Sequence, residues 1–131
     1  MFEGRIIFVG LHNKPHMSPL DSHTKTGKLI DRIINELPNN IEILKTNLFD
    51  VDYMPDAFES NELATEWYLT HFPNEEDVII LLGAMVHNKF KKCYGEIIKV
   101  AHPASKRSHI QMDEYVSTTA GKIMKAILCK T

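Results

Sequence analysis

The chain has 131 residues, of which 44% are apolar and 24% charged, a composition typical of a globular domain and not of a disordered or fibrous protein. Its formal net charge of −2 provides no overall attraction to nucleic acids or membranes, so binding to either would need a local patch. It contains no apolar run of the roughly twenty residues that a membrane span needs, and no signal-peptide pattern opens it. We therefore expect one domain over residues 1–131, located in the cytoplasm and without membrane association.

The first part of the chain predicts a strand, a long loop and a helix. Residues 6–9 are a short apolar run that ends at Gly10, and apolar residues at helical spacing predict a helix over residues 26–37. Residues 11–25 lie between them and are polar, with three histidines and two prolines. Connections in compact βα units usually take about two to six residues, so a loop of this length is typical of a functional segment.

Three further strand and helix pairs follow in the same alternating order. The predicted strands are residues 41–49, 78–82 and 95–101, and the predicted helices are residues 62–72, 84–92 and 112–128. The strand over 78–82 has the clearest pattern, because an unbroken apolar run fits a strand buried on both faces of a parallel sheet. Ser60 or Asn61 is the expected N-cap of the second helix.

This alternation predicts a three-layer α/β/α fold, with a four-stranded parallel sheet covered by helices on both faces. Ligands bind to such sheets outside the carboxyl ends of the strands, near the point where the strand order reverses. The residues expected at the four strand ends are Gly10, Asn47, Gly83 and His102. We expect the functional site where these four residues meet.

Five short motifs lie at or just after these strand ends. They read Gly10-Leu11-His12-Asn13-Lys14-Pro15, Thr26-Gly27-Lys28-Leu29-Ile30-Asp31, Thr46-Asn47-Leu48-Phe49, Leu81-Leu82-Gly83 and His102-Pro103-Ala104-Ser105. In this order they resemble the motifs of the uracil-DNA glycosylase superfamily, which include a glycine-led first motif, an asparagine ending the second strand, and a His-Pro-Ser motif. The resemblance covers nearly the whole chain, which would be a divergent and short member.

The resemblance implies a base-excision repair enzyme that flips a nucleotide out of DNA and hydrolyses its N-glycosidic bond. The substrate would be DNA containing uracil or a related base, and the protein would act as a monomer without a metal or cofactor. His102 would donate a hydrogen bond to O2 of the base, where charge develops in the transition state. Asn13 would position the attacking water, and Asn47 would read the uracil edge with its amide. The base pocket would also include Gly10, Leu11 and His12.

Two departures from the family pattern concern the expected base pocket, and a third puts Lys106-Arg107-Ser108-His109 where the family often has an apolar wedge that enters the DNA stack. The first motif carries one extra residue, so an alignment without a gap puts His12 instead of Asn13 at its third position. Where several branches have an aromatic side chain that stacks on the base, this chain has Leu20. Leu20 would then contact the base, and Phe49 or Tyr53 would have to supply the stacking ring.

Basic residues concentrate after the third and fourth predicted strands. The first group is Lys89, Lys91 and Lys92, and the second includes Lys106 and Arg107. Ser105, Lys106 and Arg107 follow the His-Pro motif and are the expected contacts to the DNA backbone. The alternative interpretation is a solvated face with no ligand.

Other readings of the same residues compete with these predictions. His12, His16 and His23 could bind a metal, but no helix holds them at fixed spacing, so we expect no metal site. Cys93 and Cys129 are too far apart for a zinc motif, and we expect two reduced thiols. His102 could bond only its own loop, Asn47 could be a buried amide and Asn13 a turn residue.

Two other functions also fit the pattern. The first is a non-catalytic protein of the same fold that binds a nucleobase, a nucleotide or a partner protein. The second is an enzyme that acts on free nucleosides or RNA.

Overall fold

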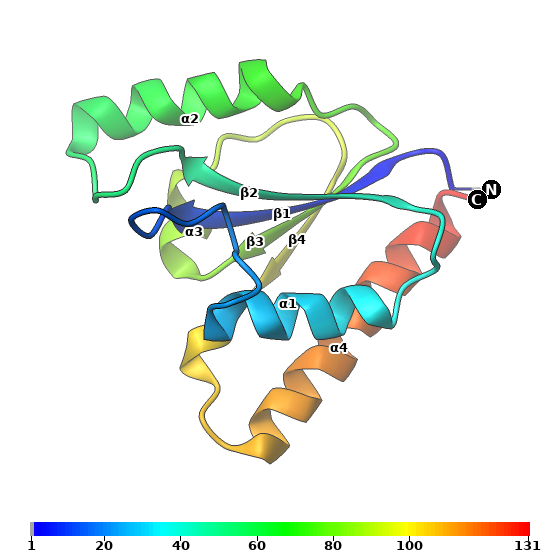
Figure 1. Ribbon diagram of the computed structural model, residues 1–131. Coiled ribbons are helices and arrows are strands. Elements are labelled where there is room, and N and C mark those ends of the chain that lie inside the picture. Colours follow the sequence, from blue (N-terminus) through cyan, green and yellow to red (C-terminus); the bar gives the residue numbers. More distant parts are fainter. Residues whose placement is uncertain (1) are drawn as a thin grey trace.

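The computed structural model describes residues 2–131 and contains one sheet of four parallel strands with helices on both faces (Figure 1). The strand order is β2-β1-β3-β4. The elements are β1 (Arg5–His12), α1 (Lys25–Asn35), β2 (Glu42–Phe49), α2 (Ala57–His71), β3 (Val78–Leu82), α3 (Ala84–Lys89), β4 (Glu96–Val100), a short 3-10 helix (Pro103–Ser105) and α4 (His109–Cys129). The alternating order and the parallel sheet are as predicted.

Two hydrophobic cores lie on opposite faces of the sheet. Ile6 and Phe8 of β1 are fully buried against α1 and α4, whereas Ile7 and Val9 are fully buried on the face covered by α2 and α3 (Figure 1). This separation follows from the alternation of side chains along a strand. Burying each such side chain stabilises the fold by about 1.5–3 kcal/mol. No helix within residues 2–131 has the length and apolar character needed to cross a membrane.

Most element boundaries differ from the predicted ones by one to three residues, including the ends of α1 at Asn35 and α3 at Lys89, and the end of β1 and the starts of α2 and α4 have identifiable causes. Strand β1 continues past Gly10 to His12, because Gly10 pairs with Asn47 of β2 and His12 pairs with Phe49. Helix α2 begins at Ala57 because Asp56 caps it, accepting a hydrogen bond from the amide of Glu59 at 2.8 Å. The predicted caps of this helix, Ser60 and Asn61, therefore lie inside it.

Helix α4 also begins earlier than predicted, at His109. Ser108 and Gln111 form a capping box, in which each side chain accepts a hydrogen bond from the other residue's backbone amide. This cap fixes the helix directly after the segment that carries His102.

An ion pair holds the amino ends of the strands together. Asp77 is fully buried before β3, and its carboxylate accepts hydrogen bonds from the backbone and the guanidinium of Arg5 and from the amide of Asn74. Burial favours the protonated form of Asp77, but the hydrogen bonds from Arg5 and Asn74 outweigh it and lower the pKa of the carboxyl. Both carboxylate oxygens of Asp77 are therefore paired.

Candidate functional site

A cavity of about 490 Å³ opens at the carboxyl ends of β1 and β3, the two neighbouring strands at which the strand order reverses. All four strand-end residues, Gly10, Asn47, Gly83 and His102, line it. Its walls are otherwise mostly apolar and include Leu11, Met17, Leu20, Leu82, Met85 and Val86. A cavity of this size and character, with a few convergent polar groups, is typical of a small-molecule or cofactor site.

His102 follows β4 and is held in one tautomer by its own loop. The backbone amide of Ala104 donates a hydrogen bond to Nδ1 of His102 at 3.1 Å. Because Nδ1 accepts, the neutral ring carries its proton on Nε2. Desolvation by the surrounding protein and the nearby charge of Lys14 lower the pKa of His102, so the ring is neutral at pH 7. His102 is therefore an uncharged hydrogen-bond donor at the cavity.

Because Gly83 has no side chain, His102 can pack directly against it. Its φ is +95°, a conformation that favours glycine, and a Cβ at this position would lie 3.1 Å from Cβ of His102. The strand-ending glycine therefore brings the imidazole close to the end of β3.

The amide of Asn47 is oriented by a chain of hydrogen bonds from Asp50. Nδ2 of Asn13 donates to Oδ1 of Asp50 at 2.8 Å, and Nδ2 of Asn47 donates to Oδ1 of Asn13 at 2.6 Å. Because a carboxylate only accepts, Asp50 fixes the direction of both amides. Oδ1 of Asn47 then lies beside Gly10, where a Cβ would be only 2.3 Å away, and has no hydrogen-bond partner within residues 2–131.

Asn13 was predicted to position the attacking water in the cavity, but in the structure its side chain lies between Asn47 and Asp50. Its amide lies between Asn47 and Asp50, its backbone amide bonds the carbonyl of Val51, and its side chain is not part of the cavity wall. One N–H and one lone pair of this amide are used in the contacts to Asp50 and Asn47, and the side chain lies outside the cavity wall where a water for attack on the sugar would be held. In this structure, Asn13 positions Asn47.

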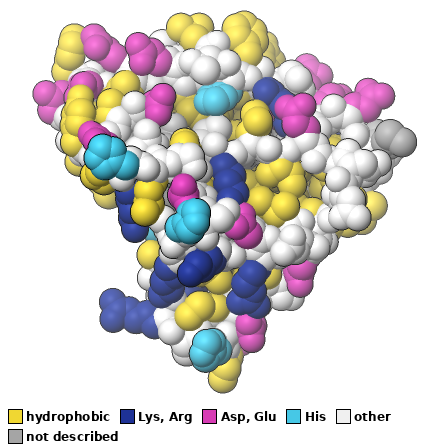
Figure 2. Space-filling view, in the orientation of Figure 1, with side chains coloured by type: hydrophobic (Ala, Val, Ile, Leu, Met, Phe, Trp, Pro, Cys, Tyr) yellow, Lys and Arg dark blue, Asp and Glu magenta, His cyan; other side chains and the backbone are white. Residues whose placement is uncertain are grey.

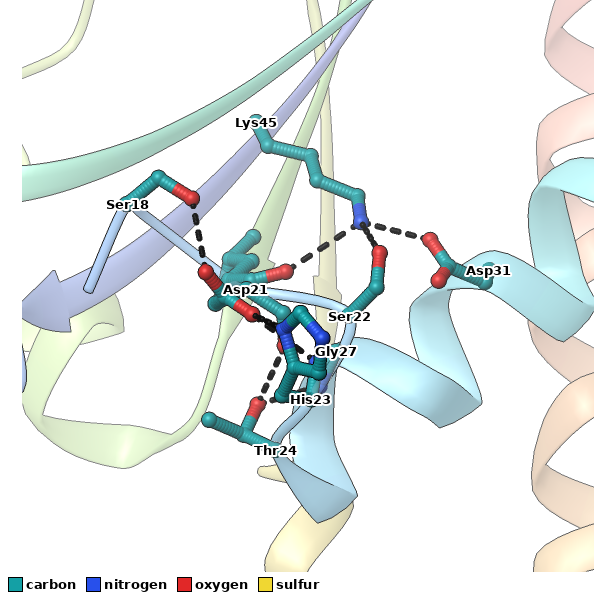
Figure 3. A network of polar contacts seen from close by, with 9 residues as sticks. Ser18, Asp21, Ser22, His23, Thr24, Gly27, Asp31 and Lys45 are labelled. Atoms are coloured by element: carbon teal, nitrogen blue, oxygen red, sulfur yellow. Dashed lines mark hydrogen bonds and ion pairs between the residues drawn. The ribbon is translucent and has the colours of Figure 1, made fainter.

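The long loop after β1 is ordered by a polar network (Figure 3). Asp21 accepts hydrogen bonds from the backbone and ring of His23 and from the hydroxyl of Ser18, and these bonds lower the pKa of its carboxyl to about 2. The hydroxyl of Thr24 caps α1 by accepting from the amide of Gly27 at 2.9 Å. A Cβ at Gly27 would lie 1.8 Å from the carbonyl oxygen of Asp21, so the loop is seated directly on the helix.

Lys45 of β2 attaches this loop to the sheet (Figure 3). Its ammonium donates to the carbonyl of Leu20 at 3.2 Å, to the hydroxyl of Ser22 at 3.3 Å and to the carboxylate of Asp31 in α1 at 2.5 Å. Leu20 has a left-handed φ of +53°, which is costly for a branched side chain. These contacts hold Leu20 in the cavity wall over Gly10.

Neither aromatic residue considered as a replacement for the stacking ring lines the cavity. Phe49 is fully buried and packs with the core beneath α2, although its spacing of two from Asn47 predicts the same face of the strand. Tyr53 is half exposed, and its hydroxyl donates to Glu59. The expected contact between Phe49 and a bound base is thus not met, because the ring completes the core instead.

The predicted DNA-backbone residues lie just beyond the cavity, after His102. The Ser105 hydroxyl donates to the carbonyl of His102 at 2.7 Å, and Lys106 lies over the ring of Tyr115 at 5.9 Å. Arg107 is exposed. In Figure 2, Lys and Arg side chains gather in the lower part of the view, over the start of α1 and the segment before α4. Basic side chains therefore lie close to the site, with acidic ones among them (Figure 2).

Sequence reasoning did not identify several residues that shape the site. Asp50 orients Asn47, Lys45 anchors the loop, and Met85 lines the cavity. A lysine within a largely apolar strand was the available signal for Lys45, and the strand-end rule applied to the β3–α3 turn was the signal for Met85. Within residues 2–131, no three His, Cys, Asp or Glu side chains are grouped as a metal site requires.

A scan against protein-family models and a search of curated proteins found no match to this chain. Function is therefore inferred from the residues of the site and their geometry.

Proposed function

We propose that this chain is a divergent member of the uracil-DNA glycosylase superfamily, which removes uracil or a related base from DNA by hydrolysing the N-glycosidic bond. One observation carries the proposal. His102 and Asn47, from opposite edges of the sheet, line one apolar cavity, where they offer an uncharged N–H donor and a fixed carbonyl acceptor. Uracil presents the complementary groups, carbonyl oxygens and an N3–H.

His102 has the property that the bond cleavage requires. When the bond between C1′ and N1 breaks, the sugar gains positive charge and the departing base becomes an anion. A donor aimed at a carbonyl oxygen of the base stabilises this charge only as it develops, and removing such a donor costs about 10²–10³ in rate. His102 is exposed in the free protein, so a bound nucleotide would have to cover it; the apolar walls would then strengthen the interaction by keeping water away.

Asn47 would provide base selectivity. Its Oδ1 is fixed as an acceptor by the chain of hydrogen bonds from Asp50 through Asn13, so it favours a base with an N3–H donor. Cytosine presents a lone pair at N3 and would leave this oxygen unpaired beside a repelling atom. The selectivity therefore depends on two residues, Asn13 and Asp50, that do not line the cavity.

Leu20 limits the affinity for the base. Stacking of a base on an aromatic ring is worth about 1–3 kcal/mol, and an aliphatic wall forgoes most of it. We therefore expect weaker base binding and slower turnover than an aromatic wall would give. Lys14 lines the cavity and Arg107 follows the His102 segment, and both would contact phosphates beside a flipped nucleotide.

The experiment is a single-turnover assay with enzyme in excess over oligonucleotides, single- or double-stranded, that carry one uracil. Treatment with alkali converts each abasic site into a strand break. We expect breaks at the uracil with the wild type and a rate about 10²–10³ lower with His102→Ala. The matched control is His16→Asn, because His16 is exposed, does not line the cavity, and has a φ of +59° that asparagine tolerates.

Two results would contradict the proposal. The first is the absence of abasic sites with the wild type at any enzyme excess, and the second is equal cleavage by His102→Ala. Retention of uracil or a nucleotide without any strand break would indicate the alternative, a non-catalytic binding protein of this fold.

A further inference from the structure

Two histidine rings line the cavity, and the backbone fixes them in opposite tautomers. Nδ1 of His12 lies 3.1 Å from the carbonyl oxygen of Asn13, whereas Nδ1 of His102 accepts from the amide of Ala104. A carbonyl oxygen only accepts, so in the neutral ring Nδ1 of His12 carries the proton and Nε2 has a free lone pair. His12 therefore offers an acceptor nitrogen, and His102 offers a donor.

The position of His12 is well defined. It is the last residue of β1, and it pairs with Phe49 in the parallel ladder, so its backbone belongs to the sheet and not to the loop. Nε2 of His12 has no hydrogen-bond partner within residues 2–131. A side chain built on a strand and tethered at one ring nitrogen is preorganised to use the other.

Other residues near the cavity are poorly suited to accept a proton. Both carboxylate oxygens of Asp21 accept hydrogen bonds from Ser18 and His23, and its low pKa makes it a weak base. Lys14 is a cation, and the amide of Asn13 is not basic and is engaged at both ends. Among the described residues of the wall, His12 is the one with a free lone pair on a basic nitrogen.

We infer that His12 is the general base of this site and takes a proton from the water that attacks the sugar. The inference rests on the proposed function. The bond between C1′ and N1 of the nucleotide breaks, and its electron pair leaves with the base, whose carbonyl oxygen accepts from Nε2–H of His102. The water oxygen bonds to C1′, and its proton passes to Nε2 of His12 and from there to the base anion. Water is the only co-reactant.

The first test measures the tautomers without any substrate. In long-range ¹H–¹⁵N correlation spectra of uniformly labelled protein above pH 8, we expect His12 to show a protonated Nδ1 and His102 a protonated Nε2. The single variants His12→Asn and His102→Ala assign the two rings. A protonated Nε2 on His12 would overturn the inference, whether or not the protein cleaves DNA.

The second test measures catalysis under single-turnover conditions. Asparagine at position 12 can keep the hydrogen bond to the Asn13 carbonyl but has no atom in place of Nε2. We expect His12→Asn to cleave uracil-containing DNA at least ~10²-fold more slowly than the wild type, and His16→Asn to match the wild type. Binding of an uncleavable uracil-DNA analogue should be nearly unchanged, because the lost group acts on water.

The outcomes separate the two proposals. Cleavage by His12→Asn at the wild-type rate would overturn the role of His12 and leave the glycosylase proposal standing. A wild type that never cleaves would overturn the proposed reaction, and the general-base role with it. Weak analogue binding with an unchanged rate of the bound complex would also contradict the inference, because it would assign His12 to binding alone.

Discussion

The two ends of the sheet differ in whether the polar atoms of their side chains have hydrogen-bond partners. At the amino ends of the strands, both oxygens of Asp77 are paired, with Arg5 and Asn74. At the carboxyl ends, Oδ1 of Asn47 and Nε2 of both His12 and His102 have no partner within residues 2–131. None of these three atoms is both fully buried and unpaired, so water can bond them in the free protein and a ligand can replace that water. The difference indicates that one end of the sheet is built for stability and the other for a ligand.

The largest expected effect is at the amino end. Asp77→Ala should lower the free energy of unfolding by about 3 kcal/mol, because it leaves the partly buried guanidinium of Arg5 without its carboxylate. Urea denaturation at pH 7 measures the change. The control is Asp113→Ala, which breaks an exposed ion pair with Arg32 and should cost less than about 0.5 kcal/mol. Equal losses in the two variants would contradict the comparison.

The lowered pKa of Asp77 also predicts how the free energy of unfolding depends on pH. The pKa of Asp77 is lowered in the folded protein from its ordinary 3.8, so its contribution is present above that value and is lost as the pH falls below it. The stability difference between the wild type and Asp77→Ala should therefore narrow in acid, as denaturation at several pH values would show.

The next-largest effect is at the carboxyl end of the sheet and should appear in the rate of uracil excision. Gly10→Ala would place a methyl group 2.3 Å from Oδ1 of Asn47, so the amide must move. We expect uracil excision to fall about 10- to 100-fold, corresponding to a loss of one or two hydrogen bonds to the base. Gly121→Ala is the control, because a Cβ there meets nothing within 4 Å. It should stabilise α4 by up to about 1 kcal/mol and leave excision unchanged.

A smaller effect, on base selectivity, should follow from breaking the chain of hydrogen bonds from Asp50 through Asn13 to Asn47. Asp50→Ala leaves Asn13 free to rotate, so Asn47 loses its fixed direction. The ratio of uracil to cytosine excision should fall about fivefold, which corresponds to about 1 kcal/mol of discrimination. Rates on matched oligonucleotides measure this ratio. Asp52→Ala removes a nearby exposed carboxylate and should not change it.

The smallest effect concerns the charge state of His102. Desolvation and the charge of Lys14 lower the pKa of the ring below its ordinary 6.5, so its NMR titration should have a midpoint below that value. Lys14→Ala removes one of the two causes and should move the midpoint upward. Lys125→Ala, on α4, should leave it in place. A downward or absent shift with Lys14→Ala would contradict the assignment.

Much of the fold could be predicted, because the chain alternates clearly between apolar runs and amphipathic stretches. The bounds of β3 are those predicted, since its run is apolar throughout. The start of α2 was missed because Phe58 is 74% exposed, so the first turn has no apolar face. Asp56 followed by Glu59 at the third helical position was the signal that could have located it.

The site could be predicted in part. Parallel strands end at one edge, so the positions of Asn47 and His102 follow from the order of elements. The tautomers of the two histidines and the contact from Asn13 to Asp50 could not be predicted, because they depend on bonds that only the folded chain makes. The core position of Phe49 contradicts simple strand alternation, and the sequence carries no signal of it.

The strand order has a consequence for the dynamics of the site. Asn47 lies on β2 and His102 directly follows β4, so these two residues come from the two outermost strands, with β1 and β3 between them. Outer strands exchange their amide hydrogens through local opening more readily than central ones. Opening at either edge would dismantle the cavity while the rest of the sheet stayed folded. A bound base would therefore slow hydrogen exchange at both edges of the sheet at once.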